Sequence, residues 1–111
     1  MLAHMPTEQA ASYLSGIRFE PITPRTITSL DRLRKEIAAV RRDGFAYSRE
    51  EFTLGITGLA TAILDGKRLL GALNLAVPTA RLTPEQEAKF KRRMVSVAAS
   101  LSNALRSVAS A

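Results

Sequence analysis

Residues Gly55–Pro78, GITGLATAILDGKRLLGALNLAVP, decide the fold of this chain. Two apolar runs flank the dipeptide Asp65-Gly66. This arrangement is a strong signal for a β-hairpin, because the turn needs a positive φ that glycine adopts without steric cost. We therefore predict two long antiparallel strands joined by a tight turn at Asp65-Gly66.

The length of the turn determines which residues pair across the hairpin. A loop of three residues, Asp65 to Lys67, pairs small residues with one another. The pairs are then Gly58 with Asn74, Ala60 with Ala72, and Ile56 with Ala76. A loop of two residues slips the register by one and places Asn74 opposite Thr57. In the first register, one face is lined by small residues and one asparagine, which leaves room for a ligand or for a closely packed helix.

The composition is that of one globular domain. The chain has 111 residues, of which 46% are hydrophobic and 23% charged, values that argue against disorder. It has no cysteine and one histidine, His4. Disulfides, thiolate metal sites and zinc sites with several histidines are therefore excluded, and nucleophile–histidine catalysis lacks its partners. We predict that the chain is not an enzyme and needs no metal or cofactor.

The net charge is +6, from 16 basic and 10 acidic residues. The basic residues gather on two predicted helices, at Arg32, Arg34, Lys35, Arg41 and Arg42 and at Lys89, Lys91, Arg92 and Arg93. A basic balance can indicate nucleic-acid binding, but no aromatic residue is interleaved with these runs as a stacking platform. Solvated helix faces are the favoured interpretation. No apolar run reaches the roughly 18–20 residues of a membrane span and no signal peptide is visible, so we expect a cytoplasmic protein without membrane contact.

The clearest helix follows the hairpin. Thr83 is its predicted N-cap, Pro84 its first residue, and Gln86 completes a capping box. Apolar residues then recur every three or four positions, at Phe90, Met94, Val97, Leu101, Leu105 and Val108. This spacing predicts a continuous apolar stripe of about five turns.

Shorter elements precede the hairpin. Helices are predicted over residues 6–14 and 29–43, with Thr28 at capping-box spacing before the second and Gly44 after it. A short strand is expected over residues 45–47, followed by a polar turn. The sum is an α+β fold, with an antiparallel sheet flanked by helices.

Several short motifs occur in an order and spacing that resemble one protein family. They are Thr23-Pro24-Arg25-Thr26-Ile27-Thr28, Val40-Arg41-Arg42-Asp43-Gly44-Phe45-Ala46, Glu50-Glu51 with Gly55 shortly after, and Pro78 followed by Ala80-Arg81-Leu82-Thr83. From about Leu2 to Leu105, the chain resembles the effector-binding domain of the IclR family of bacterial transcriptional regulators.

The resemblance implies a GAF-like or profilin-like sensor domain for a small-molecule effector, often an organic or aromatic acid. Family members assemble as dimers or tetramers and bind DNA through an N-terminal winged helix-turn-helix. Neither that domain nor the first strands of the effector domain is recognisable here. We therefore expect residues 1–111 to form roughly the second half of an effector-binding domain, which contacts DNA only through a domain absent from this chain.

Carried over by position, the family's effector contacts fall on Ser48, Gly58, Asn74 and Ala76. The family often has Asp at the first position and hydroxyl residues at the last two, so the polar groups differ here and imply a bulkier or more apolar effector. The three-residue loop places Gly58 and Asn74 on one face, as the family site requires, and we prefer that register.

The residues themselves leave alternatives open. A buried Asn74 needs a hydrogen-bond partner, which is equally a ligand, the backbone or water. Ser48 is more often a turn residue that bonds its own backbone. Glu50 and Glu51 resemble an acid/base pair, but adjacent carboxylates point apart, which favours solvation or a structural contact. The second functional hypothesis is a structural half-domain that self-associates through its last helix and open strand edge and binds no ligand.

Overall fold

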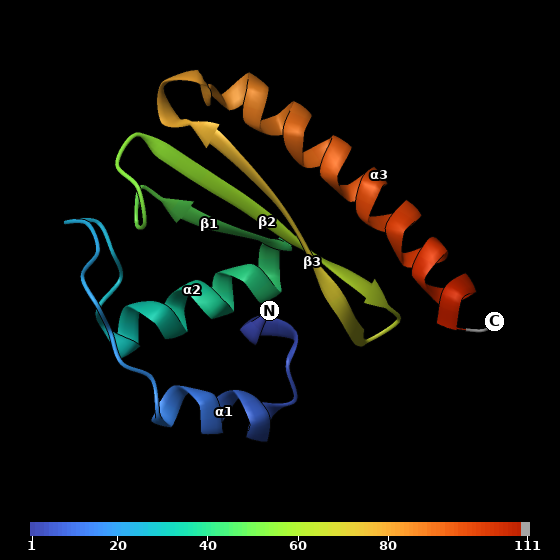
Figure 1. Cartoon of the computed structure of the whole chain (residues 1–111), viewed down its shortest axis with the longest axis horizontal. Coiled ribbons are helices and arrows are strands. Elements are labelled where there is room, and N and C mark those ends of the chain that lie inside the picture. The colour runs from blue at the N-terminus through green and yellow to red at the C-terminus, as the bar shows by residue number, and fades with distance from the viewer. Residues whose placement is uncertain (110–111) are drawn as a thin grey trace.

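The computed structural model describes residues 1–109 (Figure 1). In chain order, its elements are η1 (Leu2–His4), α1 (Thr7–Ser15), α2 (Leu30–Asp43), β1 (Phe45–Arg49), β2 (Ile56–Asp65), β3 (Arg68–Pro78), η2 (Thr79–Arg81) and α3 (Pro84–Ala109). The strands form one antiparallel sheet in the order β1-β2-β3. The helix α3 lies along one side of the sheet, and α1 and α2 lie on the other (Figure 1). The predicted α+β class is confirmed.

The hairpin differs from the register that we preferred. Only Gly66 and Lys67 separate β2 from β3, and Gly66 has the positive φ, 60°, that the turn requires. A β-bulge then follows between Ile63 and Leu64, where β3 contributes one residue more than β2. Neither predicted loop length alone gives this arrangement, because a sequence signal for the turn carries no information about the bulge.

Beyond the bulge, the pairs are Ala62 with Ala72, Ala60 with Asn74, Gly58 with Ala76, and Ile56 with Pro78. The predicted pairs of Gly58 with Asn74, Ala60 with Ala72, and Ile56 with Ala76 are therefore wrong by two residues. A shift of two leaves every side chain on the face that it had, because side chains alternate along a strand. The predicted face of small residues is consequently present.

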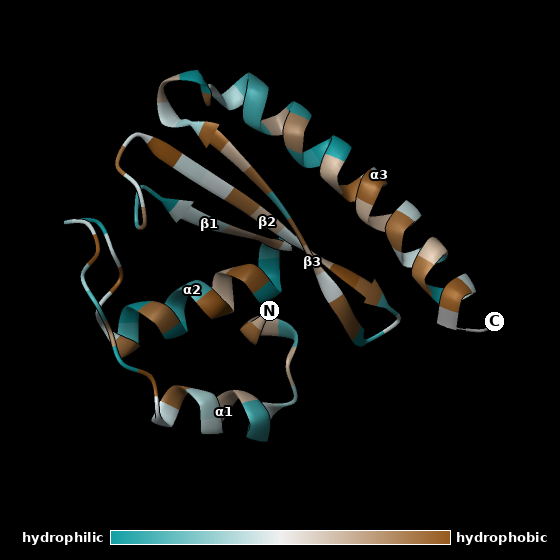
Figure 2. Cartoon of the chain, in the orientation of Figure 1, coloured by the Kyte–Doolittle hydropathy of each residue, from teal (hydrophilic) through white to brown (hydrophobic). Residues whose placement is uncertain are grey.

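The larger residues of the hairpin meet α3 on the opposite face. Leu59, Val77 and Met94 form the buried centre of the core, and Leu59 is only 1% exposed. The Oγ1 atom of buried Thr57 lies 2.9 Å from that of Thr79, so this hydroxyl is satisfied inside the core. Hydrophobic residues recur along both long strands and along α3 (Figure 2).

The helix α3 rests on the sheet through small residues as well as Met94. Its buried positions are Met94, Ala98 and Ser102, spaced one turn apart, and the Ser102 hydroxyl donates to the Leu64 carbonyl at 2.5 Å. The predicted stripe lies beside this line. Its C-terminal members are partly or largely exposed: Val97 36%, Leu101 36%, Leu105 41% and Val108 74%. Small side chains let the helix approach the sheet closely, which rotates the larger ones to its flank.

The local sequence signals predicted most helix ends correctly, and the structure differs at two points. Gly44, with φ of 82°, ends α2 as predicted, and Gln86 N–H donates to Thr83 Oγ1 at 3.2 Å at the start of α3. The cap of α2 is Ser29, whose Oγ accepts from Arg32 N–H, rather than Thr28. The strand β1 extends two residues further than predicted, so that Ser48 belongs to the sheet rather than to a turn.

Replacing Leu59 with alanine tests the packing of the core. Leu59→Ala removes a fully buried side chain, so we expect the free energy of unfolding to fall by about 2–5 kcal/mol, measured by urea denaturation. Leu54→Ala is the matched control, because Leu54 is 57% exposed, and it should change stability by less than about 0.5 kcal/mol. Equal effects of the two substitutions would contradict the assigned faces.

Candidate functional site

Three of the predicted site residues form a row across the sheet. Ser48 of β1 pairs with Gly58 of β2, and Gly58 pairs with Ala76 of β3. A Cβ atom built on Gly58 would lie 3.6 Å from the Cβ of Ser48, so these residues are immediate neighbours. Asn74 shares the face one pair along, opposite Ala60. The structure thus brings all four positions, from three strands, onto one surface.

This part of the face is open to solvent. Ser48, Asn74 and Ala76 are exposed, and Gly58 is half-buried. The amide of Asn74 therefore does not carry the cost of a buried polar group, and its donor and acceptor are accessible. Gly58 and Ala76 contribute space and backbone rather than side-chain chemistry.

The rest of the small-residue face is used for packing. Ala46, Ala60, Ala62 and Ala72 border Met1, His4 and Val40, and only about 20 Å³ of space remains between them. The absence of larger side chains here allows the N-terminal residues and α2 to lie close to the sheet. The two interpretations of the small face, helix packing and open site, therefore each apply to a different end of it.

An apolar pocket of about 310 Å³ adjoins Ser48. Its apolar walls come mainly from α2, the N-terminal residues and the segment before α2, and include Leu2, Ile27, Leu33, Ile37 and Val40. The charged residues in its lining are Glu36 and Glu51. Sequence reasoning predicted an apolar pocket on the small-residue face but not these walls, which meet only after the connector between α1 and α2 (residues 16–29) folds onto β1.

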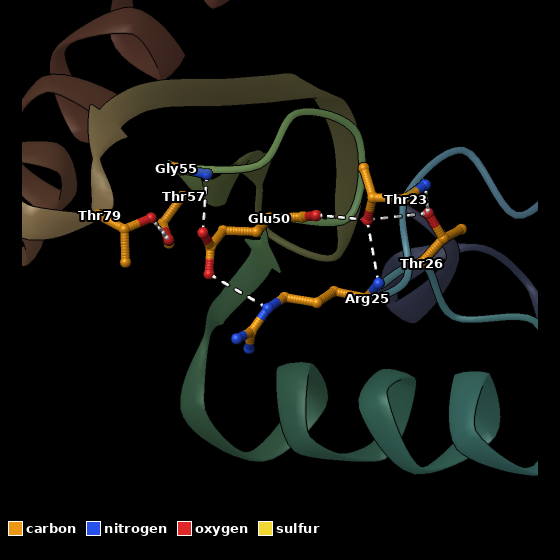
Figure 3. A network of polar contacts seen from close by, with 7 residues as sticks. All are labelled: Thr23, Arg25, Thr26, Glu50, Gly55, Thr57 and Thr79. Carbon is orange, nitrogen blue, oxygen red and sulfur yellow. Dashed lines mark hydrogen bonds and ion pairs between the residues drawn. The ribbon is translucent and has the colours of Figure 1, made fainter.

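The connector and the β1–β2 loop are held together by a network of polar contacts (Figure 3). Thr23 Oγ1 donates to the Glu50 carbonyl at 2.6 Å, and Thr26 Oγ1 donates to the Glu51 carbonyl. The Glu50 carboxylate accepts from Gly55 N–H at 2.7 Å and lies 3.4 Å from Arg25 Nε. Glu50 and Glu51 therefore make structural contacts, as favoured over acid/base chemistry.

This network fixes the chain immediately after Ser48. Glu50 has a φ of 58°, a conformation that is unfavourable for a residue with a Cβ and that its hydrogen bonds stabilise. The hydroxyl of Thr23 also accepts from Arg25 N–H at 3.0 Å, so that the Thr-Pro-Arg-Thr motif folds back on itself. The spacing of the two threonines was the only sequence signal for the network.

Cations and aromatic rings meet on the α3 side of β1. The guanidinium carbon of Arg49 lies 4.2 Å from the centre of the Tyr47 ring. Lys91 Nζ lies 5.0 Å from the Tyr47 ring centre and 5.3 Å from that of Phe45. The pKa of Lys91 is raised, chiefly by a hydrogen bond with the Tyr47 side chain. These contacts attach the N-terminal half of α3 to β1.

Neither a metal cluster nor a membrane helix occurs in the described part of the chain. Within residues 1–109, no group of three histidine, cysteine or acidic side chains is placed to hold a metal ion. No helix in the same range is long and apolar enough to cross a membrane.

The architecture defines the class of protein as an α+β domain of the GAF-like or profilin-like type. The sequence model described as "Bacterial transcriptional regulator IclR C-terminal" matches residues 1–103. This chain belongs to the IclR family, and the match is to the family's C-terminal, effector-binding domain. The predicted membership is confirmed.

Individual relatives agree with this assignment. The HTH-type transcriptional regulator Rv1719 of Mycobacterium tuberculosis is 38% identical over 81 residues, which cover 73% of this chain and 31% of that protein. The crystal structure of a transcriptional regulator from Rhodococcus sp. RHA1 aligns with a TM-score of 0.88 at 29% identity, covering 96% of this chain and 44% of that one. The C-terminal domain of E. coli KdgR aligns with a TM-score of 0.84 at 25% identity, covering 92% and 63%. The chain thus spans about a third of Rv1719.

Replacing Thr23 with valine tests the network that fixes the connector. Thr23→Val keeps the shape of the side chain but removes the hydrogen bonds to Glu50 and Arg25. We expect a loss of about 1 kcal/mol of stability and faster trypsin cleavage after Arg25, followed by mass spectrometry. Thr28→Val, at an exposed position outside the network, is the control; an unchanged cleavage rate in Thr23→Val would refute the structural role.

The cation–π contacts of Lys91 lead to a prediction about pH. Lys91→Met keeps most of the aliphatic part of the side chain but removes the charge. We expect the free energy of unfolding to fall by about 0.5–1 kcal/mol. Because folding raises the Lys91 pKa above its ordinary value of 10.5, this stabilisation is complete below that value and is lost as pH rises through the raised pKa. Urea unfolding should therefore give a constant difference between wild type and variant from about pH 6 to about pH 9, and a smaller one above.

Lys89→Met is the matched control for this measurement, because Lys89 is exposed on the same helix. It should leave stability nearly unchanged. An equal loss in the two lysine variants would show that general charge effects, rather than the two rings, account for the stabilisation.

Proposed function

We propose that this chain is the effector-sensing part of an IclR-type transcriptional regulator. In this proposal a small organic or aromatic acid binds the open end of the small-residue face, at Ser48, Gly58, Asn74 and Ala76. Binding modulates a DNA-binding winged helix-turn-helix domain that lies outside this chain. The observation that carries the proposal is the row of family effector positions on one accessible surface beside an apolar pocket of about 310 Å³.

The chemistry of the surface supports an acid with an apolar body. The Ser48 hydroxyl and the Asn74 amide supply hydrogen-bond donors for a carboxylate, and hydrogen bonds to charged groups are stronger than those between neutral ones. The space over Gly58 and Ala76 admits a bulkier ligand than larger side chains would allow. The apolar walls beside Ser48, including Ile37 and Val40, then bury the body of the ligand.

The proposal also concerns the larger protein in which this domain functions. We infer that residues 1–111 form part of an effector-binding domain in a cytoplasmic regulator that works as a homo-oligomer, a dimer or tetramer. The relative Rv1719 is named an HTH-type regulator, and this chain spans only 31% of it. Regulation, rather than catalysis, fits the relatives that the chain matches.

A structural role is the second candidate function. It is favoured by two features of residues 1–109: the exposed side chains of Leu101, Leu105 and Val108 on α3, and the edge of β3 that no other strand pairs with. In this alternative the chain self-associates through these surfaces and binds no ligand. Calorimetric titration with aromatic acids separates the two, because both self-associate but only the sensor has a saturable small-molecule partner.

Two substitutions test the effector site in the intact regulator. Ser48→Ala and Asn74→Leu each remove a donor, so we expect calorimetric affinity for the best ligand of an organic-acid panel to fall by about tenfold or more. Ser96→Ala, at an exposed position of α3, is the control. The proposal fails if both site variants retain the affinity of the wild type.

A further inference from the structure

We propose that the chain has a second ligand site, at the junction of α2 with the outer side of β1, for a small carboxylate that carries one negative charge and an apolar body. A cavity of about 480 Å³ lies there. Its charged and aromatic lining consists of Arg25, Arg32, Arg49, Glu36, Glu51 and Tyr47. None of the four proposed effector residues belongs to it, but it shares Ile27, Glu36, Tyr47 and Glu51 with the apolar pocket beside Ser48.

Three separate elements bring the arginines together. Arg25 comes from the connector, Arg32 from the first turn of α2, and Arg49 from the end of β1. Their separation in the sequence explains why the charge pattern did not predict this site. A guanidinium group presents several donors in a fixed plane and can bind a carboxylate through two of them.

Two of these guanidinium groups are not neutralised by the protein. Arg25 is paired with Glu50, but no carboxylate of residues 1–109 lies within 4.0 Å of the side-chain nitrogens of Arg32 or Arg49. The Arg49 side chain is instead held 4.2 Å over the Tyr47 ring. Stacking restricts the conformation of the guanidinium group but does not neutralise its charge. Its N–H donors therefore remain available to a ligand.

The carboxylates of the cavity limit the charge of that ligand. Glu51 Oε1 accepts from Ile27 N–H at 3.4 Å and is directed to the connector, whereas the Glu36 carboxylate forms no hydrogen bond or ion pair within residues 1–109. Because Glu50 offsets Arg25, the two unpaired arginines face two glutamates in the lining. Two guanidinium groups can bind one carboxylate, while the additional negative charge of a polyphosphate would be repelled by both glutamates. The apolar lining at Pro24, Ile27 and Ala39 suits a hydrocarbon body.

Titration of the whole chain with benzoate tests the site. At constant ionic strength, calorimetry should show saturable binding of benzoate and much weaker binding of benzyl alcohol, which lacks the charge. Arg32→Gln and Arg49→Gln should each weaken benzoate binding by about tenfold or more. Arg34→Gln is the matched control, since Arg34 is exposed on α2 and does not line the cavity. Arg49→Lys should restore binding only in part, because lysine lacks the planar fork.

Amide chemical shifts of the wild-type chain provide a measurement that does not depend on the variants folding. Benzoate should shift the amides of residues 25–32 more than those of Ser48 and of residues 58–62 and 72–76. Larger shifts in the second group, with affinity lost in Asn74→Leu but kept in Arg32→Gln, would overturn this inference while supporting the effector site. Equal affinity in every arginine variant, or no saturable binding, would overturn it as well.

Discussion

The bulge between Ile63 and Leu64 is the constraint on which the rest of the structure depends. With the observed turn at Gly66-Lys67 and no bulge, Leu59 would pair with Asn74 and Gly58 with Leu75, and each face would mix large with small side chains. The extra residue in β3 shifts the pairing by one residue, so that Leu59 pairs with Leu75 and Gly58 with Ala76. Large apolar residues then share one face and small ones the other.

This separation determines what each face of the sheet can do. The face with Leu59 and Val77 buries its side chains against α3 and supplies the core. The opposite face has little apolar bulk, so it contributes less to stability and is free to be shaped for a ligand. Ala60 and Ala62 on this face are covered by the N-terminal residues. Ser48 and Asn74 on the same face are accessible.

Sequence reasoning predicted the features that local chemistry determines. Thr83 caps α3 because its hydroxyl accepts from the exposed amides of the first turn, and Gly44 ends α2 because it adopts a positive φ. Gly58, Asn74 and Ala76 were placed on one face because side-chain alternation survives a shift of two, whereas Ser48 was expected in a turn and joins them through β1. The pairing itself was wrong, because a bulge depends on how both strands pack. The predicted apolar stripe of α3 agrees with the buried line at Met94 and diverges from it afterwards, since the short packing distance favours Ala98 and Ser102 over the larger neighbouring residues.

The features that sequence reasoning missed altogether depend on contacts between distant segments. Arg25, Arg32 and Arg49 meet only because Thr23 and Thr26 bind the carbonyls of the β1–β2 loop and hold the connector against β1. The same contacts stabilise the positive φ of Glu50, two residues after Ser48. A single network therefore sets both the end of β1 that carries Ser48 and the wall of the arginine-lined cavity. A movement of the connector would therefore change both surfaces, although each also contacts α2 directly.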